Sequence, residues 1–157
     1  MKIESWFIGK TSPTYLQTGL DDFCYRIKKY VPFETIILPD IKDAGNLAIR
    51  ERLQKEGEKV LQKIAVQDYL ILLDEGGKEF TSIQFSRFIE NELHKSHKKL
   101  IFLIGGAFGF SEAIQKRANF KLSLSKMTYS HQMVRLFFLE QLYRGFTILN
   151  NEPYHNA

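Results

Sequence analysis

Residues 103–128, LIGGAFGFSEAIQKRANFKLSLSKMT, contain the pattern that decides the fold. The segment completes one apolar strand, turns through a glycine-rich stretch and returns as a second strand, in which Phe120, Leu122 and Leu124 alternate with polar residues. Between the two strands, Ser111 is placed to cap a short helix. A polar turn then leads into the last helix of the chain. A strand, a helix and a strand in this order form the repeating unit of a parallel sheet.

The same alternation extends through the earlier part of the chain. Runs rich in apolar and β-branched residues predict strands at Ile3–Ile8, Phe33–Leu38, Tyr69–Leu73 and Leu100–Ile104. Apolar residues three and four apart predict helices between these strands, at about residues 13–30, 47–64 and 82–93. We expect one α/β domain, residues 1–157, with a mostly parallel sheet flanked by helices on both faces.

Capping residues mark where two of these helices begin. Ser12, followed by Pro13, is placed to cap the first helix. Thr81 and Gln84 have the spacing of a capping box before the third.

The last helix, from about Gln132 to Leu149, is apolar around almost its whole circumference. Such a helix must be buried on several sides. In a chain of this size we expect it to pack partly on the core and partly on a second subunit, which predicts a symmetric homodimer.

Composition limits the classes of function. The chain has 22 Lys and Arg against 18 Asp and Glu, a net charge of +4, which permits a polyanionic partner without requiring one. The single cysteine, Cys24, excludes an intramolecular disulfide and a Cys-rich zinc site, so we expect a reducing cytoplasm. The four histidines lack the carboxylate spacing of a metal site, and no apolar run reaches membrane-spanning length. We therefore expect no metal and no membrane partner.

The second predicted helix carries a basic set of side chains with two interpretations. Glutamates are interleaved with the basic residues, which favours a solvated face of mixed charge over a surface for RNA phosphates. The basic residues are Lys42, Arg50, Arg52, Lys55 and Lys59.

Ligands of parallel sheets bind beyond the carboxyl ends of the strands, so the loops after Leu73 and Ile104 are the expected site. The glycines at 105, 106 and 109 do not have the dinucleotide-binding spacing, and no Walker lysine follows them. Taken alone, they are explained equally well by a tight turn. Asp74 and Glu75 are interpreted as loop carboxylates near a ligand, with a catalytic acid pair as the alternative.

Six spaced blocks of the sequence carry a family resemblance. They are residues 73–78 (LDEGGK), 102–109 (FLIGGAFG), 122–128 (LSLSKMT), 131–135 (HQMVR), 140–144 (EQLYR) and 153–155 (PYH). In this order they closely resemble the RlmH (YbeA) family of SPOUT RNA methyltransferases, over the whole length of the chain.

The resemblance implies a deep trefoil knot near the C-terminus and a homodimer. It implies transfer of a methyl group from S-adenosyl-L-methionine to N3 of a pseudouridine in large-subunit ribosomal RNA, on assembled ribosomes. The implied cofactor residues are Leu73, Gly105, Leu124, Ser125, Lys126, Met127, Thr128 and Tyr129. One departure is Ser130, where the family usually has proline before the histidine.

The resemblance also places Arg144, Tyr154 and His155 near the substrate. His155 is the first candidate for the base that takes the N3 proton, and Arg144 is a candidate for stabilising the resulting anion. Without the family, His155 is simply a residue near the chain end, and Arg144 a salt-bridge or helix-terminal residue. Two other functions stay open: a SPOUT enzyme that methylates tRNA or a ribose, and a non-catalytic module that binds RNA or the ribosome.

Overall fold

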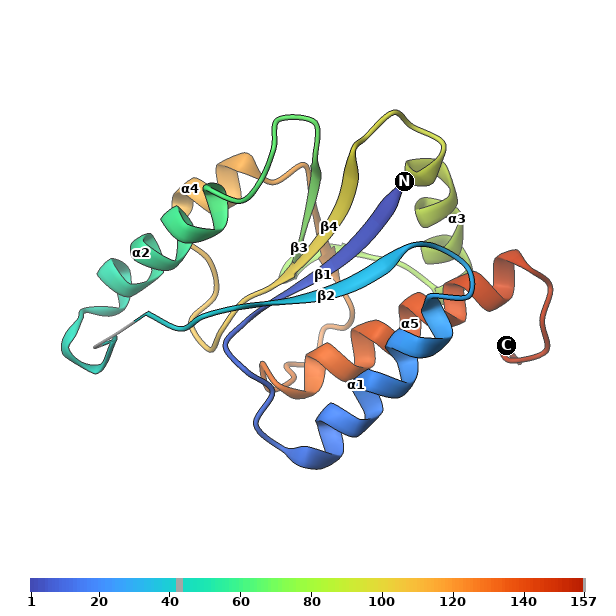
Figure 1. Ribbon diagram of the computed structural model, residues 1–157, viewed down its shortest axis with the longest axis horizontal. Helices are drawn as coiled ribbons and strands as arrows, with labels where there is room; N and C mark the ends of the chain where they lie inside the picture. The colour runs from blue at the N-terminus through green and yellow to red at the C-terminus, as the bar shows by residue number, and fades with distance from the viewer. Residues whose placement is uncertain (42–43, 157) are drawn as a thin grey trace.

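The computed structural model describes residues 1–41 and 44–156, and within them a five-stranded sheet with the strand order β2-β1-β4-β3-β5 (Figure 1). Every neighbouring pair in this sheet is parallel, which confirms the predicted α/β architecture. The strands are β1 (Lys2–Ile8), β2 (Phe33–Leu38), β3 (Tyr69–Glu79), β4 (Lys99–Ile104) and β5 (Phe120–Ser123).

Helices cover both faces of the sheet, as predicted. Helices α1, α3 and α5 pack on one face, and α2 and α4 pack on the other (Figure 1). Their bounds are α1 (Thr14–Ile27), α2 (Ile49–Leu61), α3 (Ser82–Leu93), α4 (Glu112–Arg117) and α5 (Met133–Leu149), and a 3-10 turn spans Ala44–Asn46.

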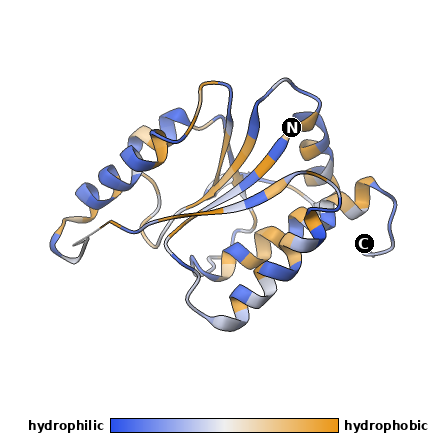
Figure 2. Cartoon of the chain, viewed as in Figure 1, coloured by the Kyte–Doolittle hydropathy of each residue, from blue (hydrophilic) through white to orange (hydrophobic). Residues whose placement is uncertain are grey.

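Alternate side chains of the strands form two hydrophobic cores, because successive residues of a strand point to opposite faces. In β1, Phe7 belongs to the core under α1, α3 and α5, whereas its neighbour Trp6 belongs to the core under α2 and α4. The central strand β4 is buried from Leu100 to Ile104. Figure 2 shows the apolar residues gathered along the strands and on the inward sides of the helices.

Strand β3 differs from its prediction. It runs on to Glu79 and does not end at Leu73, but Leu73 and Lys78 both lie opposite Leu122 of β5, so residues 74–77 bulge out of the sheet. The bulge depends on Gly77, because a β-carbon there would lie 2.6 Å from the backbone carbon of Lys121. The expected loop is therefore an insertion within a strand.

Two of the three predicted caps are confirmed. Thr81 and Gln84 form the capping box of α3, and the Ser111 hydroxyl accepts from the backbone N–H of Ile114. The Ser12 prediction is wrong: Pro13 is the capping residue of α1, and its carbonyl accepts the first backbone bonds of the helix. The Ser12 N–H instead donates to the Gln132 side chain.

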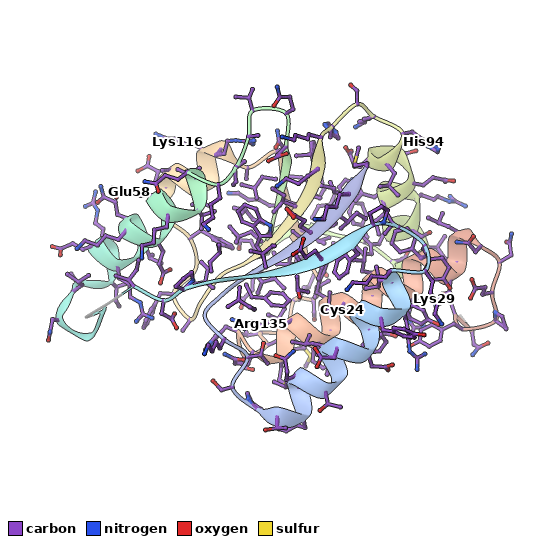
Figure 3. All side chains as sticks on the ribbon, in the orientation of Figure 1. Cys24, Lys29, Glu58, His94, Lys116 and Arg135 are labelled. Carbon is purple, nitrogen blue, oxygen red and sulfur yellow. The ribbon has the colours of Figure 1, made fainter. Side chains whose placement is uncertain are left out.

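Arg135, in the first turn of α5, is fully buried between the helix and the end of β1 (Figure 3). Its guanidinium donates to the carbonyls of Ile8 and Gly9, at 2.7 and 3.0 Å, and to the Thr11 hydroxyl. Burial lowers the pKa of this arginine. These bonds tie the start of the last helix to the end of the first strand.

Candidate functional site

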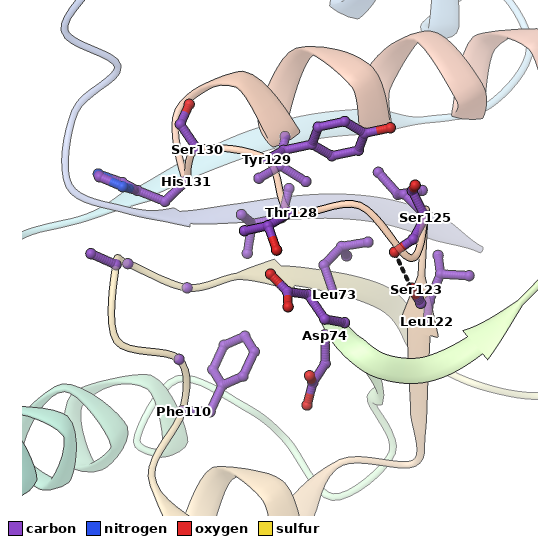
Figure 4. A pocket seen from close by; sticks show the side chains of 18 of the residues that line it. Leu73, Asp74, Phe110, Leu122, Ser123, Ser125, Thr128, Tyr129, Ser130 and His131 are labelled. Carbon is purple, nitrogen blue, oxygen red and sulfur yellow. Dashed lines mark hydrogen bonds between the residues drawn. The ribbon is translucent and has the colours of Figure 1, made fainter.

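A pocket of about 560 Å³ lies where the bulge interrupts β3, beside the carboxyl ends of β4 and β5 (Figure 4). Three segments supply most of its lining: Leu73 with the β3 bulge, the glycine turn after β4, and residues 122–125 and 127–131. Its volume falls in the range of small-molecule sites. The pocket is therefore at the position where open parallel sheets bind ligands.

Most of the residues that the resemblance assigns to the cofactor meet at this pocket. All of them line it except Lys126, which is exposed on the turn. The lining members are Leu73, Gly105, Leu124, Ser125, Met127, Thr128 and Tyr129.

The glycine turn shapes one wall. A β-carbon at Gly105 would lie 2.9 Å from the Phe110 ring and 3.1 Å from the Gly109 carbonyl oxygen. Gly109 has φ of +82°, which favours glycine. The missing side chain at Gly105 thus lets the Phe110 ring pack against the turn.

Serine side chains shape the opposite wall. The Ser123 hydroxyl donates to the Ser125 carbonyl, and the Ser125 hydroxyl accepts from the N–H of Met127 at 2.9 Å. Ser130 accepts from the N–H of Met133 through its hydroxyl at 3.1 Å. Ser130 therefore closes the turn before α5 with a hydrogen bond that a proline could not make.

Arg144, Tyr154 and His155 form a second cluster, organised by Glu140. The Glu140 carboxylate accepts from the Arg144 guanidinium and, at 2.9 Å, from the Tyr154 hydroxyl. The Arg144 guanidinium also lies over the Tyr154 ring. Burial, followed by the bond to Glu140, raises the pKa of Tyr154, so this phenol is a neutral donor.

The same cluster determines the tautomer of His155. The Arg144 Nη1 lies 3.1 Å from His155 Nδ1. Because a guanidinium has only donors, Nδ1 must accept this bond and the neutral ring carries its proton on Nε2. In this arrangement Nδ1 of His155 is occupied by Arg144.

This cluster does not lie at the pocket of the same chain. None of its residues lines the pocket, and Arg144 follows the pocket residue Val134 by ten positions along α5. At the rise of an α-helix this is about 15 Å. The chain therefore has two separate groups of candidate residues, joined by one helix.

Sequence reasoning missed several residues at both places. The pocket lining also includes Phe108, Phe110, Gln115, His131 and Val134. Glu140 could have been predicted from the sequence, because a glutamate four residues before an arginine on a helix is placed to contact it.

The basic residues around α2 remain open to both interpretations. Arg52 pairs with the buried carboxylate of Glu56 and lies over the Phe108 ring, whereas Arg50 and Lys55 are exposed. Lys42 lies outside the described residues. Burial raises the pKa of Glu56.

Two features are absent from residues 1–41 and 44–156. These residues contain no group of three or more His, Cys, Asp or Glu side chains that could hold a metal ion. None of their helices has the length and apolar character needed to cross a membrane.

Comparison with known proteins gives the family. Residues 1–155 match the family model described as a predicted SPOUT methyltransferase. The chain belongs to this SPOUT methyltransferase family. Membership implies that the segment from β5 into α5 forms the trefoil knot of the SPOUT fold.

Similar curated proteins cover the same length. The chain is 52% identical to a protein of Parabacteroides distasonis and 53% identical to one of Flavobacterium johnsoniae, each over 99% of both chains. A protein of Porphyromonas gingivalis is 40% identical over the same share. Each relative is named ribosomal RNA large subunit methyltransferase H.

Proposed function

We propose that this SPOUT protein transfers a methyl group from S-adenosylmethionine to N3 of a pseudouridine in large-subunit ribosomal RNA, on assembled ribosomes. The observation that carries the proposal is the convergence of three segments on one pocket: the β3 bulge and the segments that follow β4 and β5. The name of the relatives supports the RNA class of the substrate.

The pocket fits S-adenosylmethionine in size and in chemistry. It has about 560 Å³, apolar walls from Leu73, Leu124 and Phe110, and two carboxylates in its lining. Backbone groups of the glycine turn and of residues 124–129 are available to the adenine and the amino acid part. We propose that Leu73, Gly105 and residues 124–129 hold the cofactor, with Lys126 at the rim.

We further propose a homodimer, because the pocket and the Arg144 cluster are far apart within one chain. The partly exposed residues of α5 form one face, on which Met133 and Phe137 lie near the pocket and Arg144 lies at the other end. Phe137 is 41% exposed. A two-fold axis across the middle of this face would bring Arg144 of the partner subunit toward Val134.

In this arrangement each residue has a defined task. The bound cofactor supplies a methyl group already activated by its sulfonium sulfur, so the protein mainly holds donor and acceptor in line and excludes water. Arg144 stabilises the negative charge that develops on the pyrimidine. When Arg144 turns to the substrate it releases Nδ1 of His155, which is then free to accept the N3 proton. Tyr154 packs against the guanidinium and keeps it in reach.

We also propose that residues 1–157 form one domain that acts in the cytoplasm. The family match over residues 1–155 supports the first statement, and the single cysteine supports the second.

The deciding experiment uses S-adenosylmethionine labelled in its methyl group. The protein is incubated separately with whole ribosomes, isolated subunits, free ribosomal RNA and tRNA, and the modified nucleoside is identified by mass spectrometry. We expect 3-methylpseudouridine from ribosomes. Label in tRNA or in a ribose would establish a different SPOUT enzyme, and ribosome binding without cofactor binding would establish a non-catalytic module.

A further inference from the structure

The charge of the pocket wall is one-sided. The lining contains two carboxylates, Asp74 and Glu75, and no lysine or arginine among the described residues that form it. This contrasts with the whole chain, in which basic residues outnumber acidic ones by 22 to 18. A cationic ligand is therefore favoured at this pocket on a protein that is itself cationic.

The bulge in β3 brings both carboxylates to the pocket. Asp74 directly follows Leu73 on the wall (Figure 4), and its side chain accepts from the Gly76 N–H at 3.0 Å. The close approach of Gly77 to Lys121 and Leu122 keeps the bulge against β5. Without the bulge, residues 74–77 would continue the strand beside β5, and their side chains would alternate between the two faces of the sheet.

We propose that Asp74 and Glu75 make the pocket selective for the sulfonium form of its ligand, so that it binds S-adenosylmethionine more tightly than the product S-adenosylhomocysteine. This inference rests on the proposed function. The two ligands share the adenosine and the amino acid part and differ in one methyl group and one positive charge. Carboxylates on the wall attract that extra charge, whereas the ammonium and carboxylate of the amino acid part are common to both ligands and do not distinguish them.

The reaction itself removes the charge. The bond between sulfur and the methyl carbon breaks with its electron pair left on sulfur, and the new bond to N3 forms from the pair left when the N3 proton departs. The sulfur becomes a neutral thioether, and the proton is released. The attraction of Asp74 and Glu75 for the ligand then falls, which favours exchange of product for a new cofactor.

The test is calorimetric binding of three probes to the full-length protein: S-adenosylmethionine, S-adenosylhomocysteine and sinefungin, whose amine supplies a positive charge near the position of the sulfonium. The variants are Asp74→Asn, which retains the oxygen that accepts from Gly76, and Glu75→Gln. Glu79→Gln is the matched control, because Glu79 is an exposed carboxylate of the same strand outside the pocket lining.

We expect each pocket variant to lose about threefold in affinity for the two charged probes, and the double variant about tenfold. Affinity for S-adenosylhomocysteine should fall less than affinity for the two charged probes, and all affinities of Glu79→Gln should stay unchanged. Raising the salt concentration should reduce the preference of the wild type. Equal losses for charged and neutral probes, or no loss, would overturn this inference alone. A wild-type protein that binds none of the probes would overturn the proposed function as well.

Discussion

Mixing two inactive subunits should restore activity if the pocket and the Arg144 cluster meet across a dimer. Arg144→Ala removes the proposed anion-stabilising group and leaves the pocket untouched. Gly105→Val fills the pocket wall, because its β-carbon would lie 2.9 Å from the Phe110 ring. Each homodimer should therefore be inactive, for different reasons.

The size of the rescue follows from the arrangement of the two groups. Val134 at the pocket and Arg144 are about 15 Å apart along α5, so we expect the two groups to meet at one substrate base only across a dimer. In a heterodimer of the two variants, one site combines an intact pocket with an intact partner cluster, and the other site combines both defects. The heterodimer should therefore have about half the activity of the wild-type dimer.

The assay uses co-expression with two different affinity tags, tandem purification of the heterodimer, and methylation of ribosomes with labelled cofactor. Heterodimers of wild type with each variant serve as controls, and each should also have one intact site. A heterodimer of the two variants no more active than its parents would refute the composite site and show that each chain uses its own cluster.

Three further predictions concern single positions. Gly77→Ala should lower the free energy of unfolding by about 2–3 kcal/mol, because its β-carbon would overlap the backbone of Lys121, whereas Gly76→Ala has no atom nearer than 3.8 Å and should unfold in urea like wild type. Equal stability of the two variants would contradict the account of the bulge. His155→Ala should leave the calorimetric affinity for S-adenosylmethionine unchanged and slow methylation of ribosomes about 100-fold, with His94→Ala as the surface control; an unchanged rate would exclude His155 from the chemistry. Burial raises the pKa of the Cys24 thiol from 9.0 to about 11. The pKa of this thiol is higher in the folded than in the unfolded protein, so the stability that the neutral thiol contributes is complete below pH 9 and is lost as the pH rises toward 11. Between these two pH values, the free energy of unfolding from urea titrations should fall by up to ~2 kcal/mol more for wild type than for Cys24→Ala. Parallel curves for the two proteins would contradict this expectation.

The sheet was predictable from sequence because its signals are local. Buried strands such as Leu100–Ile104 are continuous apolar runs, and the capping box at Thr81 specifies where α3 begins. The convergence of the loops after Leu73 and Ile104 followed from the rule that parallel strands end at one edge.

The remaining features depend on contacts between distant residues. The β3 bulge arises because Gly77 lies against the backbone of Lys121, and the local sequence at neither position predicts this contact. Tyr154 returns to Glu140 through a turn in which Asn151 has φ of 55°, a conformation that asparagine allows and does not require. Lys126 is exposed and absent from the pocket lining, in a turn shaped by the hydrogen bonds of Ser123 and Ser125.

The buried guanidinium of Arg135 has a consequence for synthesis of the chain. Its acceptors, the carbonyls of Ile8 and Gly9, leave the ribosome before Arg135, which follows more than 120 residues later. Until then the carbonyls at the end of β1 lack these bonds, and the sheet is open at the edge where the pocket forms. Contacts of such sequence separation make folding slow. We expect the nascent chain to remain sensitive to proteases until the last helix emerges, and then to become protected in a single late step.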